Sequence, residues 1–284
     1  MVNTNKQPLV LFFILAYAIS WILWLPLLLS RRGLCILPVD LPMSAILPGA
    51  FGPSVAAYLT HRWCCGNWRA VDFFLGWRRA WIGILIAPFL FCVGQVVIPA
   101  LLLTKSPAAD LHWKALLNYP FAVVYWGTLL ISPLGEELGW RGYALPKLQC
   151  MMGAFRATMV LGLLWALWHL PLFLIKGWTN TSVPVFVMLG IARATIITCV
   201  FNWSGGSVIV AIIAHSAVNA RGHVLIDLLA GAPTREGVSV VHVMALSLLT
   251  LAVLLTAFTR GRLGKAEAKN GTKDALDVSA QHAA

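Results

Sequence analysis

Long apolar stretches separated by short polar loops are the feature that most constrains the fold of this chain. The stretch from Pro8 to Leu29 contains no charged residue, and it has the length of about 20 residues that a helix needs to cross a membrane. Hydropathy divides the chain into about eight such segments, near residues 9–30, 43–60, 81–103, 118–138, 155–175, 183–201, 206–226 and 240–259. In lipid, the backbone N–H and C=O groups of such a segment must form hydrogen bonds with each other, which a helix allows. The sequence therefore predicts an all-α, polytopic membrane bundle of about eight transmembrane helices.

Composition supports this class and excludes a water-soluble protein. Hydrophobic residues make up 60% of the 284 residues and charged residues 11%, with a mean hydropathy of +0.82. Soluble domains have roughly 45–50% apolar and 25% charged residues. Because the predicted spans use most of the length, we expect a single transmembrane helical domain over residues 1–260 and a polar, disordered cytoplasmic tail over residues 261–284.

The positive charges are placed as expected of a membrane protein rather than of a nucleic-acid-binding protein. Most of them flank apolar segments, where Lys and Arg favour the cytoplasmic side. With eight spans both termini share one side, which collects Lys6, Arg62, Arg69, Arg78, Arg79, Arg141, Lys147, Arg156, Arg260, Arg262 and Lys265. The opposite side holds Arg31, Arg32, Lys105, Lys114, Lys176, Arg221 and Arg235. We therefore predict a multi-pass protein of the cell membrane with both termini cytoplasmic, the lipid bilayer as its surroundings and no nucleic-acid partner.

A pair of glutamates lies at the inner end of the fourth predicted span, in the sequence Ser-Pro-Leu-Gly-Glu-Glu-Leu-Gly-Trp-Arg that starts at Ser132. Ionisable side chains at membrane depth are costly and mostly functional. Successive helical residues are turned by about 100°, so Glu136 and Glu137 face different partners, and Arg141 shares the face of Glu137. We predict that Glu137 pairs with Arg141 while Glu136 faces a cavity. The alternative is a solvated helix end with a surface ion pair.

Two histidines lie well inside predicted spans, each with a second informative residue four positions away on the same helical face. Trp165 precedes His169, so the indole can orient the imidazole, and Pro171 removes a helix hydrogen bond beside it. His215 precedes Asn219, and two hydrogen-bonding side chains on an apolar helix need a common polar target such as a water-filled cleft. A satisfied core histidine and interhelical hydrogen bonding by Asn219 are the structural alternatives.

Together these clusters offer a carboxylate, two imidazoles and a carboxamide on three spans, a set that can hydrolyse a peptide bond. A glutamate beside a histidine can take a proton from an attacking water, and an imidazole and an amide can stabilise the oxyanion. The carboxylate and the two histidines leave zinc open, although the His-Glu-x-x-His signature of many zinc peptidases is absent. We expect a site that works without a metal or another cofactor.

The order of the three motifs carries a family resemblance. Glu-Glu-x-x-x-Arg at 136–141, Trp-x-x-x-His at 165–169 and His-x-x-x-Asn at 215–219 resemble the CAAX-protease and bacteriocin-processing (CPBP, or Abi) family, whose eukaryotic members include the Ras-converting type II CAAX prenyl endopeptidase. The resemblance covers a core of about residues 118–225. It implies a glutamate-type intramembrane endopeptidase that cleaves a membrane-associated or lipidated, CAAX-like peptide or protein substrate.

The resemblance also implies a role for each motif residue. Glu136 would activate the water together with His169, and His215 with Asn219 would form the oxyanion site. Structural support of the site would fall to Glu137, Arg141 and Trp165. At about 1.5 Å per residue, Glu136 lies near the cytoplasmic surface and His169 near mid-membrane. The two can meet only if the helices are offset or if a water-filled cleft opens from the cytoplasmic side.

Two other functions fit the same residues. The chain could be a non-catalytic membrane partner in bacteriocin immunity, or a proton-coupled transporter that uses Glu136, His169 and His215 as a relay. The sequence shows no convincing internal repeat, which argues against the transporter. Arg193, near the middle of the sixth predicted span, needs an acid partner, for which Glu137 and Asp227 are candidates.

Overall fold

A computed structural model of the chain describes residues 7–65, 77–121 and 127–265. Within these ranges every regular element is a helix, apart from an isolated bridge between Thr104 and Thr234. Five helical segments are long and apolar enough to cross a membrane: Gln7–Leu29, Ala80–Leu103, Ala154–Leu174, Val183–Trp203 and Val240–Phe258. The prediction of an all-α membrane helix bundle is therefore confirmed.

The elements follow the predicted spans in order, with several interruptions. They are α1 (Gln7–Leu29), η1 (Met43–Ile46), α2 (Leu47–Ala50), α3 (Gly52–Cys65), α4 (Trp77–Cys92), η3 (Val93–Val97), α5 (Ile98–Leu103), η4 (Ala108–Asp110), η5 (Trp113–Asn118), α7 (Gly127–Gly139), η6 (Trp140–Ala144), α8 (Leu145–Met152), α9 (Ala154–Trp168), η7 (Leu170–Leu174), α10 (Val183–Trp203), α11 (Val208–Asn219), α12 (Arg221–Leu228) and α13 (Val240–Phe258).

Three predicted spans are not continuous helices of membrane length. The span near 43–60 is divided into η1, α2 and α3, since Pro48 and Pro53 each remove a backbone donor around Phe51. The span near 206–226 divides at Ala220 into α11 and α12. The span near 118–138 appears as α7, and its residues 122–126 lie outside the described part of the chain.

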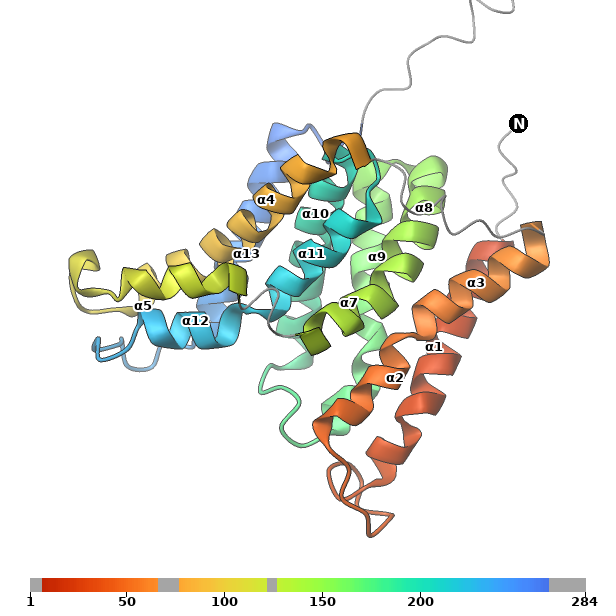
Figure 1. Cartoon of the computed structure of the whole chain (residues 1–284), viewed down its shortest axis with the longest axis horizontal. Coiled ribbons are helices and arrows are strands. Elements are labelled where there is room, and N and C mark those ends of the chain that lie inside the picture. The colour runs from red at the N-terminus through yellow and green to blue at the C-terminus, as the bar shows by residue number, and fades with distance from the viewer. Residues whose placement is uncertain (1–6, 66–76, 122–126, 266–284) are drawn as a thin grey trace, which may run out of the picture.

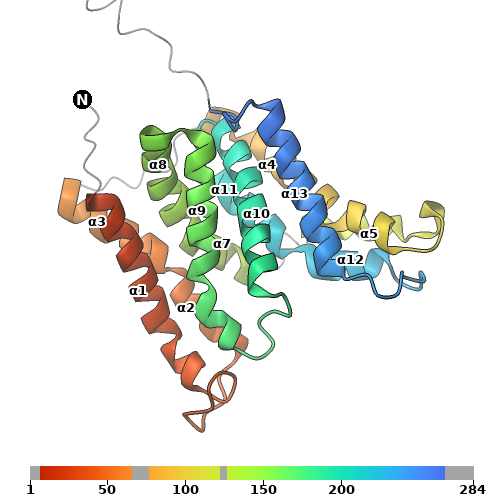
Figure 2. The same cartoon turned by 180° about the vertical axis from the view of Figure 1, so that it is seen from behind.

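The long helices run between two ends of the bundle, which we call the terminal end and the distal end (Figures 1 and 2). The terminal end holds the start of α1, the junction of α8 with α9, and the last described residues. There Asn202 Nδ2 donates to the carbonyl oxygen of Leu263 at 2.8 Å. The distal end holds segments 30–46 and 175–182, where the backbone N–H of Lys176 donates to the carbonyl oxygen of Arg32 at 2.7 Å.

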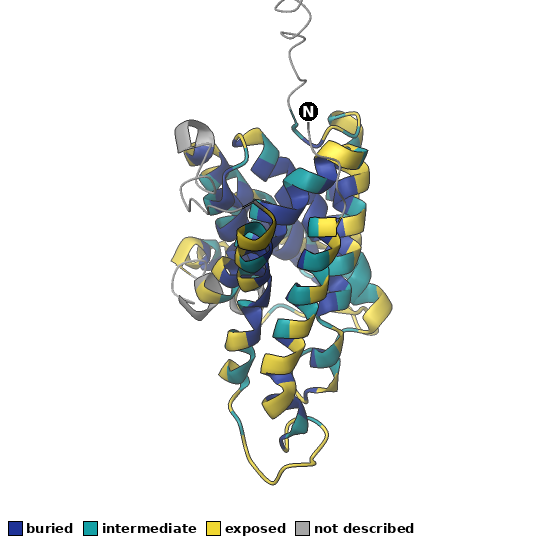
Figure 3. Cartoon of the chain, turned by 90° about the vertical axis from the view of Figure 1, so that its right-hand side faces the viewer, coloured by how far each residue is buried: buried dark blue, intermediate teal, exposed yellow. Residues whose placement is uncertain are grey.

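Small residues let the helices that surround the centre of the bundle approach closely. A Cβ atom added at Gly190 of α10 would lie 2.8 Å from the Cβ of Ala166 on α9, and one at Gly162 would lie 3.0 Å from Ala194. Close contact through small residues is the usual means of helix packing in membranes. The buried residues fill the interior, while exposed residues cover the outer helix faces (Figure 3). Large apolar side chains on these faces, such as Phe258 at 83% exposure, are suited to lipid.

The first part of the predicted tail packs against the bundle. Leu263 is fully buried and contacts Ala154 and Cys199 at the terminal end. Residues 266–284, the rest of the segment predicted as a disordered tail, lie outside the described residues.

Candidate active site

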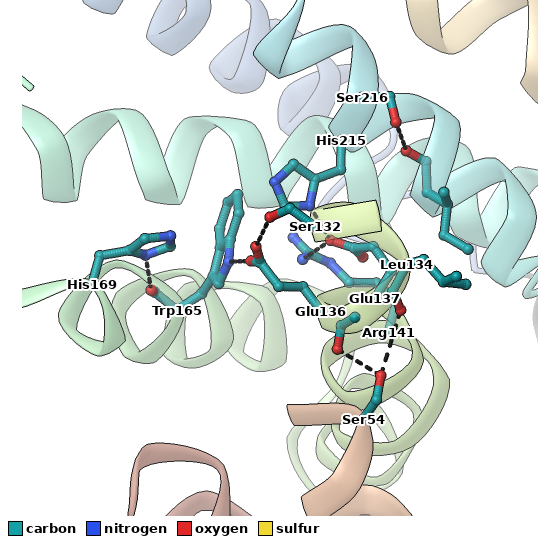
Figure 4. Close-up of polar contacts among 12 residues, drawn as sticks. Ser54, Ser132, Leu134, Glu136, Glu137, Arg141, Trp165, His169, His215 and Ser216 are labelled. Atoms are coloured by element: carbon teal, nitrogen blue, oxygen red, sulfur yellow. Dashed lines mark hydrogen bonds and ion pairs between the residues drawn. The ribbon is translucent and has the colours of Figure 1, made fainter. Parts of the chain in front are cut away.

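Glu136 projects from α7 into the centre of the bundle, where two donors hold its carboxylate (Figure 4). The hydroxyl of Ser132 donates to Oε1 at 2.9 Å, and the indole Nε1 of Trp165 donates to Oε2 at 2.8 Å. The residue is 3% exposed. Ser132 lies one helical turn before Glu136, and Trp165 comes from α9, so the two donors fix the carboxylate from two helices.

Glu137 points to the other side of α7 and binds two cationic or ionisable groups (Figure 4). Its Oε1 accepts from Arg141 Nη1 at 2.7 Å and from His215 Nδ1 at 2.9 Å. Glu137 and Arg141 are both fully buried, and the guanidinium carbon of Arg141 lies 4.8 Å from the centre of the Trp165 ring. This cluster therefore joins α7 to α11 and supports the indole that holds Glu136.

His169 is held at the end of α9 by the backbone of Trp165. Its Nδ1 lies 2.8 Å from the carbonyl oxygen of Trp165. Because a carbonyl oxygen only accepts, Nδ1 carries the proton in this bond, and Nε2 of the neutral ring keeps a lone pair. The ring is stacked on Trp178 and meets Trp168 and Phe186 edge-on. These contacts hold the imidazole ring in one orientation.

The structure does not join Glu136 and His169 directly, as a shared hydrogen bond would. Trp165 lies between them and binds both, with its indole N–H on Glu136 and its carbonyl oxygen on His169. His215 meets the same indole edge-on at 5.1 Å between ring centres. Trp165 thus organises all three groups, which is a larger part than its predicted role of orienting one histidine.

A cavity of about 670 Å³ connects these groups, a volume typical of ligand sites. Its polar wall consists of Ser132, Glu136, His169, Arg193, His215 and Asn219. Its apolar wall includes Trp24, Met43, Ile46, Leu172, Trp178 and Phe186. All four residues predicted to be catalytic line this cavity, whereas Glu137 and Arg141 lie behind the wall in the ion-pair cluster.

The cavity extends toward the distal end of the bundle. Ser44 and Thr179, from the two distal segments, belong to its wall, and α1 contributes Trp24 from its distal half. No residue of segments 143–158 or 201–208, which meet at the terminal end, lines it. The open space of the cavity therefore lies toward the distal end, opposite the termini.

Some site residues were not identified from the sequence. Ser132 carries a signal in retrospect, since it lies four residues before Glu136 and shares its helical face. Trp178 lies in the loop between η7 and α10, Phe186 lies in the first turn of α10, and no spacing relates them to His169. Arg193, for which an acid partner was predicted, is 6% exposed and lines the cavity.

The side chains of the site do not form the ligand set of a catalytic zinc. Such sites use three protein ligands. In the described ranges, no three His, Cys, Asp or Glu side chains gather closely enough to share an ion. Both oxygens of Glu136 and the Nδ1 atoms of both histidines already have protein partners. The arrangement therefore does not fit a metal centre.

Two comparisons with known proteins bear on this site. Residues 117–221 match a family model described as type II CAAX prenyl endopeptidase Rce1-like. The chain is also 25% identical, over 247 residues, to CAAX prenyl protease 2 of Methanococcus maripaludis, and the match covers 79% of this chain and 88% of that relative. The matched family region contains all three motifs and the six residues named above as the polar wall of the cavity.

Proposed function

Because residues 117–221 match a family model described as type II CAAX prenyl endopeptidase Rce1-like, we propose that this chain is an intramembrane endopeptidase of that type in which Glu136 activates the attacking water. The observation that carries the proposal is a buried carboxylate, oriented by Ser132 and Trp165, on the wall of a cavity that also contains two imidazoles. A general base of this kind contributes roughly 10²- to 10⁴-fold to a rate.

The reaction is a hydrolysis that needs no reagent besides water. Glu136 takes a proton from water as its oxygen attacks the peptide carbonyl carbon, while Nε2 of His169 accepts the other hydrogen of the same water and orients it. The proton on Glu136 then passes to the leaving nitrogen as the C–N bond breaks. The products are a carboxylic acid and an amine, between which a proton then passes to give a carboxylate and an ammonium group, and Glu136 is again ready as a base.

His215 and Asn219 stand across the cavity as donors to the oxyanion. The carboxylate of Glu137 only accepts, so Nδ1 of His215 donates to it. Nε2 of His215 can then donate to the oxyanion only when the ring carries a second proton, whereas the carboxamide of Asn219 can donate in either state. A donor of this kind is worth roughly 3–4 kcal/mol in the transition state.

The walls suit a peptide with a bulky apolar or lipidated group beside the bond that is cut. Trp24, Trp168, Trp178 and Phe186 supply large aromatic faces, and the polar groups are gathered on one side. A lipid chain or apolar side chain on the aromatic side would place the peptide carbonyl over Glu136. Distribution of Lys and Arg at the loops supports a membrane orientation with both termini cytoplasmic.

The test is cleavage by the purified, detergent-solubilised protein on a mixture of prenylated CAAX peptides and unmodified membrane-proximal peptides. We expect cleavage that falls at least about 100-fold in His169→Ala and that a chelator leaves unchanged. The control is His242→Ala, because His242 is an exposed histidine on α13 outside the cavity. Cleavage of no peptide at all would favour a non-catalytic membrane partner, and loss of cleavage with chelator would overturn the metal-free mechanism.

Trp165→Phe tests the positioning role of the indole. Phenylalanine keeps most of the packing but cannot donate to Glu136, so the carboxylate loses one of its two donors. We expect kcat to fall by about 10- to 100-fold with little change in KM, since a misplaced base affects the chemical step. Trp81→Phe, at a position 62% exposed on α4, is the matched control. An unchanged kcat in Trp165→Phe would remove Trp165 from the mechanism.

A further inference from the structure

We propose that Arg193 binds the C-terminal carboxylate of the substrate, so that the cavity selects a peptide that ends inside it and cuts that peptide a short distance from its end. This inference rests on the proposed function, and it adds a specificity-determining residue and the chemical group that this residue recognises. Three features carry it: the chemistry of an arginine on the cavity wall, the place of Arg193 beside α9, and the packing behind it.

Arg193 is the guanidinium group of the cavity wall. Among the described residues that line the cavity it is the only Lys or Arg, and it is 6% exposed on α10. A charged side chain at membrane depth is costly and is mostly kept for a function. The guanidinium group presents its N–H donors as a planar fork that matches the two oxygens of a carboxylate. A peptide whose carboxylate reaches Arg193 is therefore stabilised in the cavity, whereas an uncharged chain end forms no such pair.

Arg193 lies beside the part of α9 that holds the proposed base. A Cβ atom added at Gly162 of α9 would lie 3.0 Å from the Cβ of Ala194, the chain neighbour of Arg193. Trp165 follows Gly162 by less than one helical turn and donates its indole N–H to Glu136 at 2.8 Å. A carboxylate on Arg193 therefore lies in the same part of the cavity as Glu136, which places the bond that is cut close to the chain end.

The packing behind Arg193 favours the end of a chain over an acidic side chain in its middle. Among the described residues, the cavity-lining positions nearest the terminal end are Glu136 on α7, Trp165 on α9, Arg193 on α10 and His215 on α11. Residues 194–201, which follow Arg193 on α10, are all buried. A peptide cannot continue through this packed region. A terminal carboxylate needs no space beyond Arg193, whereas an aspartate or glutamate in mid-chain needs space for the residues that follow it.

The first test compares three forms of one peptide that the native, full-length protein cleaves in detergent. The first form ends in a free carboxylate and the second in a carboxamide, while the third ends in a carboxamide and carries aspartate as its second-last residue. We expect kcat/KM for the free acid to exceed that for both amides by about 10- to 100-fold, the range that hydrogen bonds to a charged group give. Equal values for the free acid and the plain amide would overturn the inference. An aspartate amide as good as the free acid would overturn it too, because the group recognised would then be an acidic side chain.

Arg193→Met tests which residue recognises the carboxylate. We expect kcat/KM for the free acid to fall by about 10- to 100-fold, mainly through KM, while the value for the amide changes little. Arg156→Met is the matched control and should keep the full preference for the free acid, because Arg156 is exposed on α9 outside the cavity wall. Equal losses for acid and amide would show that Arg193 supports the fold or the reaction instead of the chain end, and would overturn the inference. If Arg193→Met does not fold, the same comparison is made with Arg193→Gln, and a retained preference in either variant would contradict the inference.

Binding without cleavage separates this inference from the proposed function. A prenylated CAAX peptide with a dansyl group at its N-terminus is titrated into Glu136→Gln as the free acid and as the amide, and energy transfer from the tryptophans of the cavity wall gives Kd. We expect the free acid to bind about 10- to 100-fold more tightly, and the double variant with Arg193→Met to lose this difference. A preference for the acid in binding, with no cleavage of any peptide by the native protein, would reject only the proposed function. Cleavage by the native protein with equal binding of acid and amide would reject only the role of Arg193.

Discussion

Glu136→Gln should lower kcat for peptide cleavage by about 10²- to 10⁴-fold while the protein keeps its fold. The carboxamide can still accept from Trp165 and can donate to the hydroxyl of Ser132, so both hydrogen bonds of the native carboxylate have a replacement. What glutamine lacks is the ability to take a proton from water. The measurements are kcat in detergent and the melting temperature. The melting temperature should show a free energy of unfolding within about 1 kcal/mol of the native value.

The matched control for this variant is Glu236→Gln. Glu236 is 95% exposed and pairs with Lys105 at 3.7 Å on the surface, so its neutralisation should change neither rate nor stability appreciably. If Glu136→Gln retains a third or more of the native kcat, Glu136 is not the base. If Glu136→Gln unfolds, kcat is measured instead for Glu136→Asp, which keeps the charge but withdraws the carboxylate from the cavity.

Arg141→Met should produce the largest loss of stability among the site variants. It leaves the buried carboxylate of Glu137 with His215 as its partner, and removing one partner of a buried ion pair costs about 3–5 kcal/mol. For a protein of this size that corresponds to a fall in melting temperature of roughly 6–20 °C. The measurement is a thermal melt in detergent, followed by intrinsic tryptophan fluorescence.

A double variant separates the charge effect from packing. In Glu137→Gln with Arg141→Met the uncompensated carboxylate is gone, so we expect part of the lost stability to return. Additive losses would show that the guanidinium acts through its packing on Trp165 alone. Arg31→Met is the surface control, since the Arg31–Asp40 pair is 58% and 72% exposed and should be worth at most about 1 kcal/mol.

The parts of the fold that depend on composition and local spacing could be predicted. Five apolar segments are long helices at nearly the expected positions, because a membrane span needs only length and hydropathy. Contacts between residues one helical turn apart could also be predicted: Arg141 binds Glu137, and His169 lies beside Trp165. Both follow from the helical period, which the sequence displays directly.

Features that depend on how helices cross could not be predicted. The hydrogen bond between His215 and Glu137 joins residues 78 positions apart, and no local sequence pattern predicts it. The breaks at Phe51 and Ala220 lie inside segments that were each predicted as a single span. The position of the cavity likewise depends on the tilt of α7 against α9 and α10.

The division of labour within the cavity has a consequence for how such proteins diversify. The groups proposed to react, and the residues that orient them, lie on or at the ends of α7, α9 and α11, whereas much of the rest of the cavity wall is formed by the segments that follow α1 and η7. Trp165 binds both Glu136 and His169, so the relative placement of these two side chains depends on one residue. Mutations in these wall segments can therefore change which substrates fit the cavity, while the polar residues of the site stay the same. Exchanging the segments that follow α1 and η7 between relatives is accordingly a direct way to change the substrate that such a membrane protease accepts.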